Sequence, residues 1–308
     1  MLLFVAVTTA AATDAAAWKR LVHGNVVLYC HESDLGNGAS IVSIIDGALP
    51  RLLTDVGLAK PQSLTAQGLT IFLASTRDEF QGLTGGAVPE WSSGAADARR
   101  AVLFLQSPRF ADPDEPLERV VVHELAHAVL GAAMNGVEAE RWFEEGFAML
   151  ESGETGFGES IQLMWNFLLG QALPLSEIED VLTFKQPKAA LAYRESRSAV
   201  NYFVEQYGSS AVGDLIAALR MGRSMDQAMV LATGISMKSF EAEWFNIMTR
   251  RSRNAVIVDG TVVLSVVFTT LFFAALVATR VRTRRIQEEW AHQPEQNVGM
   301  DEIRPPLD

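Results

Sequence analysis

Positions 120–130 of the chain read VVVHELAHAVL, an apolar run that contains two histidines four residues apart. In a helix, residues at this spacing lie on one face, so the imidazoles of His123 and His127 can reach one metal ion. Glu124 directly follows the first histidine, where its carboxylate can act as general base on a water molecule that the metal activates. Because so short a pattern also arises by chance, the residues around it have to support it.

The region around the two histidines has the signals of a buried helix. An acid and a proline within 112–116 suit a first helical turn, and Asn135 with Gly136 indicates the end of the helix. The residues on both sides of the motif are apolar, so we expect the helix to be buried. A buried histidine needs a partner, which favours metal binding over the alternative of two core histidines bonded to backbone or carboxylate groups.

A second motif follows at positions 141–148, which read RWFEEGFA. A catalytic zinc site usually takes three protein ligands and leaves a fourth position for water. H-E-x-x-H followed by W-x-x-E-G-x-A resembles the gluzincin zinc metallopeptidases, in particular the peptidase MA-like group. The resemblance implies that Glu145, on a second helix, is the third ligand, and the neighbouring Glu144 is the alternative. Gly146 has no Cβ atom and is expected to let the second helix approach the first closely.

The resemblance extends over about 26–248 and implies a fold class. We expect an α+β, zincin-like (thermolysin-like) catalytic domain with a small N-terminal sheet, the metal helix and a helical C-terminal lobe. The resemblance also implies one Zn²⁺ per chain, bound by His123, His127 and Glu145. The implied reaction is hydrolysis of a peptide or protein substrate, with Glu124 as the general base.

One further site residue is implied by the same resemblance. Related metallopeptidases place a tyrosine or a histidine near the zinc, where it stabilises the oxyanion of the tetrahedral intermediate. Tyr193 is the candidate for this role in the predicted helical lobe. The alternative is a tyrosine whose ring is packed and whose hydroxyl is bonded at the surface.

Runs of apolar and β-branched residues predict the sheet. In zincins the last strand before the metal helix commonly runs beside the site, and so the strand at 102–106 could pair with an extended substrate. The alternative is an ordinary core strand with no free edge. The pattern predicts strands at 25–30, 69–74 and 101–105, and helices at 39–56, 161–169, 189–207, 211–219, 225–231 and 239–248.

The composition narrows the class of protein. The chain has 25 Lys and Arg residues against 37 Asp and Glu, a net charge of −12. No basic block occurs in the predicted catalytic domain, which argues against nucleic-acid binding. The single cysteine, Cys30, excludes an intrachain disulfide and a cysteine-based zinc site. Its strand-like surroundings favour a buried, inert thiol.

Both ends of the chain indicate a membrane protein. Residues 1–17 are mostly apolar and small, like a secretory signal, although they lack the positively charged start that such signals carry. Residues 255–279 carry one charge, Asp259, and predict a transmembrane helix. We therefore expect a single-pass protein of the cell membrane with an extracytoplasmic catalytic domain at 18–253. A basic and then disordered cytoplasmic tail is expected at 280–308, and the oligomeric state is open.

Two other functions are left open by the sequence. One is an intramembrane metalloprotease, because H-E-x-x-H in an apolar run also occurs inside membranes, although the run at 120–134 is too short to span one. The other is a catalytically silent zincin-fold binding domain tethered to the membrane, because a fold does not guarantee a function. The presence of Glu124 argues against this second alternative.

Overall fold

The computed structural model describes residues 18–58, 64, 68–111, 115–153 and 157–291. The chain divides after Ser252 into two compact units. The first unit is an α+β domain that holds every predicted site residue. The predicted signal-like segment at 1–17 and the end of the predicted tail, 292–308, lie outside the described residues.

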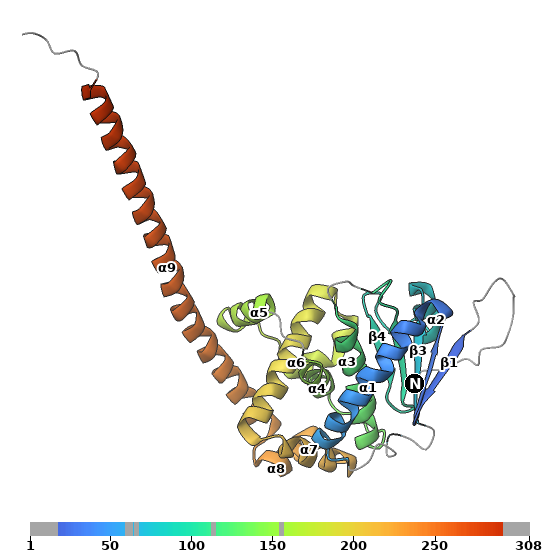
Figure 1. Cartoon of the computed structure of the whole chain (residues 1–308). Helices are drawn as coiled ribbons and strands as arrows, with labels where there is room; N and C mark the ends of the chain where they lie inside the picture. The colour runs from blue at the N-terminus through green and yellow to red at the C-terminus, as the bar shows by residue number, and fades with distance from the viewer. Residues whose placement is uncertain (1–17, 59–63, 65–67, 112–114, 154–156, 292–308) are drawn as a thin grey trace, which may run out of the picture. The chain divides into compact units, whose positions relative to one another are not determined.

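A five-stranded sheet forms one end of the first unit (Figure 1). The three middle strands are parallel, and the strand at each edge is antiparallel to its neighbour. The middle strands agree with the predicted ones, whereas the two edge strands were not predicted. In sheet order the strands are β1 (Lys19–His23), β2 (Val26–Cys30), β3 (Leu69–Ala74), β5 (Val102–Gln106) and β4 (Gly94–Asp97).

The position of β5 corrects one expectation. This strand pairs with β3 along one side and with β4 along the other, so it has no free edge. The predicted pairing of β5 with a substrate is therefore wrong, and the alternative of an ordinary core strand is confirmed. In the part of the chain that the structure describes, the free edge on this side of the sheet belongs to β4. Its sequence, GAAD, lacks the β-branched and aromatic residues that usually indicate a strand.

Helices cover both faces of the sheet. On one face lie α1 (Leu35–Asp55), which follows the short η1 (Glu32–Asp34), and α3 (Leu117–Ala133), the predicted metal helix. On the other face lies α2 (Arg77–Thr84). The alternation of side chains along β3 explains the two layers, because Ile71 packs in the large core with α1 and α3, while Phe72 packs against the small cluster around Phe80 of α2.

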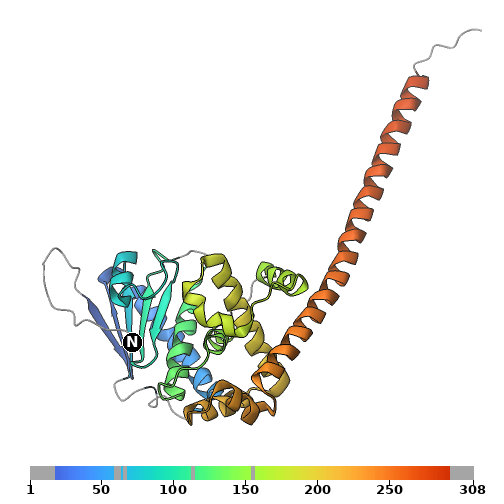
Figure 2. The same ribbon diagram turned by 180° about the vertical axis from the view of Figure 1, so that it is seen from behind.

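The second half of the unit is helical, as predicted. Figures 1 and 2 show α3 and α4 between the sheet and α6, so that the two motif-bearing helices lie at the centre of the unit. The elements are α4 (Arg141–Glu151), α5 (Phe157–Leu168), η3 (Leu175–Thr183), α6 (Gln186–Tyr207), α7 (Ser210–Arg220), α8 (Met225–Thr233) and the start of α9 (Met237–Ala291).

Gly146 does allow a close helix contact, but with a different helix from the expected one. A Cβ atom on Gly146 would lie 2.3 Å from the backbone oxygen of Ser196 and 2.6 Å from Cγ2 of Val200, both in α6. The glycine therefore lets α4 pack against α6 rather than against α3. The expectation failed because the sequence does not show which helices are neighbours in space.

The predicted transmembrane helix is wrong. Residues 255–279 form part of α9, a continuous helix of 55 residues. Among the residues that the structure describes, no helix is long and apolar enough to cross a membrane. The part of α9 at 268–285 also carries four arginines, each of which is costly in a hydrocarbon core. The fold is thus α+β without the predicted span, and α9 continues to Ala291, within the predicted tail.

Candidate metal centre

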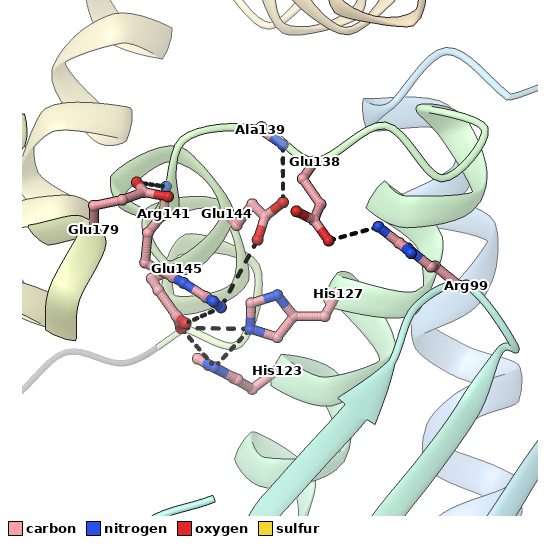
Figure 3. Close-up of polar contacts among 9 residues, drawn as sticks. All are labelled: Arg99, His123, His127, Glu138, Ala139, Arg141, Glu144, Glu145 and Glu179. Atoms are coloured by element: carbon pink, nitrogen blue, oxygen red, sulfur yellow. Dashed lines mark hydrogen bonds and ion pairs between the residues drawn. The ribbon is translucent and has the colours of Figure 1, made fainter. Parts of the chain in front are cut away.

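His123, His127 and Glu145 come together at the contact between α3 and α4 (Figure 3). The Nε2 atoms of the two histidines lie 3.2 Å apart. The Oε2 atom of Glu145 lies 3.6 Å from Nε2 of His123 and 3.4 Å from Nε2 of His127. Glu145 lies 18 positions after His127 in the chain, so this grouping is a product of how the two helices pack.

The three side chains fit a zinc ion. Donor atoms bound to tetrahedral zinc at about 2.0–2.1 Å are roughly 3.3 Å apart, which is the spacing seen among the two imidazole nitrogens and the carboxylate oxygen. Two imidazoles and one carboxylate also form a donor set typical of catalytic zinc sites, in which a fourth position stays open. The described part of the chain therefore contains a possible His/Glu metal site.

The structure places the two adjacent carboxylates differently. Oε1 of Glu144 accepts a hydrogen bond from the backbone N–H of Ala139 at 3.0 Å, in the connection between α3 and α4. Glu145 instead faces both histidines and is buried. Figure 3 shows the two side chains diverging from α4. Of the two candidates for the third ligand, the geometry favours Glu145.

Burial and the imidazoles set the protonation of the acidic residues. Burial alone would raise the pKa of Glu145, but the imidazoles of His127 and His123 outweigh burial and hold this pKa well below its ordinary value. For Glu124, burial dominates and raises the pKa, although the two histidines partly oppose it. A carboxyl group with a raised pKa is better matched to proton transfer near neutral pH, which suits a general base.

Glu124 and Tyr193 line the same cavity as the three metal-site residues. The cavity has a volume of about 860 Å³ and lies between α3, α4, α6 and the edge strand β4. Tyr193 projects from α6, and its ring meets the ring of Trp91 edge to face, with centroids 6.2 Å apart. All five site residues suggested by the sequence are thus brought to one cavity.

A comparison with known protein families gives one match. The chain matches the Peptidase MA superfamily over residues 47–250, about two thirds of its length. The chain belongs to the Peptidase MA superfamily. The matched region includes α3, α4 and α6, and with them every residue of the site. No curated protein matches the chain.

Membership of the Peptidase MA superfamily confirms the predicted resemblance to peptidase MA-like proteins and indicates a peptidase, in a superfamily that is typically metal-dependent.

Two residues at the site were not predicted. Gly94 of β4 packs directly on Glu124, and Arg141 lies 3.5 Å from Glu145. Arg141 could have been found, because it precedes Glu145 by four residues in a helix and so shares its face. Nothing local in the sequence pointed to Gly94.

Proposed function

We propose that this protein is a zinc-dependent metallopeptidase that hydrolyses peptide bonds. The observation that supports the proposal best is that His123, His127 and Glu145 each have one potential ligand atom within 4.8 Å of those of the other two. These atoms lie in a cavity that Glu124 also lines. These three residues would hold the zinc ion. When bound, zinc supplies a Lewis acid that polarises the scissile carbonyl and lowers the pKa of water toward neutrality.

The remaining chemistry falls to two side chains of the cavity. A carboxylate oxygen of Glu124 takes the proton from the attacking water and passes it to the nitrogen of the leaving amine. The hydroxyl of Tyr193 donates a hydrogen bond to the carbonyl oxygen as negative charge develops there, a contribution of about 3 kcal/mol in comparable sites. The burial of Glu124, which is 8% exposed, keeps its carboxyl in a medium that favours such transfers.

The substrate would lie along β4. Among the described strands this one pairs with β5 alone, and its residues line the cavity beside Glu124. An extended peptide can add to such a free edge by main-chain hydrogen bonds, which places its backbone in the cavity without requiring a particular sequence. The proposed substrate is therefore a peptide or a protein segment in extended conformation.

Substitution of Glu124 separates metal binding from turnover. In the purified full chain, we expect Glu124→Gln to keep one zinc per chain, measured by atomic emission. Its cleavage of a fluorogenic peptide library should fall by about 10²-fold or more. His127→Ala should lose both zinc and activity. The matched control is Glu118→Gln, an exposed acid of the same helix that does not line this cavity.

Each outcome has a distinct meaning. Full activity in Glu124→Gln would show that the mechanism is wrong. A folded parent protein that binds no metal would overturn the whole proposal. A parent that binds zinc but cleaves no peptide of the library, with or without a chelator, would favour the catalytically silent binding domain that the sequence left open.

A further inference from the structure

The two carboxylate oxygens of Glu145 face different partners. Oε2 faces the histidine pair, at 3.6 Å from His123 and 3.4 Å from His127. Oε1 faces Nη1 of Arg141 at 3.5 Å (Figure 3). One oxygen is thus directed to the candidate metal centre, and the other is paired with a guanidinium group.

The same guanidinium group lies beside Glu144. Its Nη1 atom is 3.9 Å from Oε2 of Glu144, while the other oxygen of Glu144 accepts the N–H of Ala139. Arg141 therefore lies between two adjacent carboxylates, both of which line the cavity. Without a cation here, the two negative charges would repel each other, and either carboxylate could turn toward the histidines.

Arg141 is well placed for this contact. It is the first residue of α4, and its backbone N–H donates a hydrogen bond to Oε2 of Glu179 in η3 at 2.9 Å. The helical spacing of four residues carries its side chain over Glu145. The side chain is about two thirds buried, with 32% exposed, so the ion pair is less screened than a surface pair would be.

We propose that Arg141 is a positioning residue that occupies one oxygen of Glu145, so that Glu145 offers a metal ion one oxygen and leaves a coordination position for water. Catalytic zinc sites need this open position, and a carboxylate bound through both oxygens would tend to fill it. Groups that contact the ligands rather than the metal commonly orient them in this way. The inference rests on the proposed function, because it presumes a metal ion at His123, His127 and Glu145.

Cobalt(II) reports the number of ligands directly. Four-coordinate Co²⁺ absorbs visible light more strongly than five- or six-coordinate Co²⁺, and its band positions also differ. The full chain would be loaded with Co²⁺ and its absorption compared with that of Arg141→Met, which keeps an aliphatic side chain of similar length. We expect the variant to bind one Co²⁺ per chain with weaker, shifted bands, because Glu145 is then free to bind through both oxygens.

Arg99→Met is the matched control. Arg99 also lines the cavity, but its guanidinium group pairs with Glu138 rather than with Glu145. We expect its Co²⁺ spectrum to equal that of the parent. If Arg99→Met changed the spectrum as much as Arg141→Met, loss of charge rather than loss of orientation would be the cause, and the proposal would be overturned.

The remaining outcomes distinguish a failure of the proposed role of Arg141 from a failure of the proposed metallopeptidase function. An Arg141→Met spectrum identical to that of the parent, at full Co²⁺ occupancy, would overturn the inference and leave the proposed function intact. A folded parent that binds neither Co²⁺ nor Zn²⁺ would instead overturn the proposed function. If Arg141→Met did not fold, Arg141→Lys would serve, since it keeps the charge but loses the planar guanidinium group, and we expect a smaller change of the same sign.

Discussion

Gly94 of the edge strand and Glu124 of the metal helix are in direct contact, with no room for a side chain between them. A Cβ atom on Gly94 would lie 2.6 Å from Oε1 and 2.7 Å from Cγ of Glu124. The strand proposed to hold the substrate backbone thus touches the carboxyl group proposed as general base. Because Gly94 has no side chain, β4 can lie this close to the carboxyl group of Glu124.

Gly94→Ala is expected to impair turnover without removing the metal. The new methyl group must displace the Glu124 carboxyl, and a displacement of about 1 Å in a catalytic group can cost roughly 10²-fold in rate. Kinetic measurement of kcat, together with zinc content, checks this expectation. Gly47→Ala is the control, because a Cβ on that helical glycine meets nothing within 4 Å. An unchanged kcat in Gly94→Ala would show that this contact does not position Glu124.

Gly146→Ala is expected to destabilise the fold. The added Cβ would lie 2.3 Å from the backbone oxygen of Ser196, and a backbone atom in a packed helix cannot move aside cheaply. Overpacking of this kind typically costs about 1–3 kcal/mol in the free energy of unfolding. Urea denaturation would measure the loss. Gly213→Ala in α7, where a Cβ has open space, should be neutral or slightly stabilising; equal stability of the two variants would contradict the prediction.

Tyr193→Phe is expected to lower kcat and to leave zinc binding unchanged. The substitution removes the hydroxyl proposed to stabilise the oxyanion, and loss of one such donor costs about 10²–10³ in kcat. The ring stays, so its contact with Trp91 is preserved. Steady-state kinetics on one cleaved peptide provide the measurement. Tyr207→Phe, on the same helix but outside the cavity lining, is the control. Equal kcat in parent and Tyr193→Phe would reduce Tyr193 to a packing role.

Glu195 predicts a pH dependence of stability. This carboxyl is fully buried in α6, and one of its oxygens accepts the N–H of Leu173 at 3.0 Å. Burial raises the pKa of Glu195 to about 8, from 4.5, with the hydrogen bond from Leu173 partly opposing the rise. Between these values the folded chain holds a proton that the unfolded chain releases. This contribution to stability is therefore lost as the pH rises from 4.5 to about 8.

Glu195→Gln should remove this dependence, because an amide does not ionise and can still accept the hydrogen bond. Relative to the parent, we expect little change in the free energy of unfolding at about pH 5 and a gain on the order of a few kcal/mol at about pH 9. Urea titrations at both pH values test the sign. A variant that is less stable than the parent at the higher pH would contradict the assignment of a neutral, buried Glu195.

Features with local causes could be predicted from the sequence. The middle strands and most helices agree with their predicted positions, because periodic apolar residues and terminating glycines act over a few neighbouring residues. The placement of His123 and His127 on one side of α3 has the same kind of cause, since helical geometry alone brings residues four apart to one face. The motif after them led to the correct superfamily.

The errors concern contacts between distant parts of the chain and the surroundings of a segment. The edge strand β4 has no strand-like residues and exists because it pairs with β5. The transmembrane helix at 255–279 was predicted from its own apolar run, whereas in the structure these residues are part of the continuous helix α9. In each case a short window of sequence lacks the partner or the context that decides the structure.

The sequence alone was sufficient to predict a helix with two histidines on one face, the helical lobe after it and the superfamily of the chain. It favoured Glu145 over Glu144 only through the family resemblance, and it could not find Gly94 beside Glu124 or identify α6 as the neighbour of Gly146. Those answers depend on which surfaces meet when α3, α4, α6 and the sheet pack together. Such contacts join residues far apart in the chain, and so their geometry follows from the packing of the whole domain rather than from any local pattern.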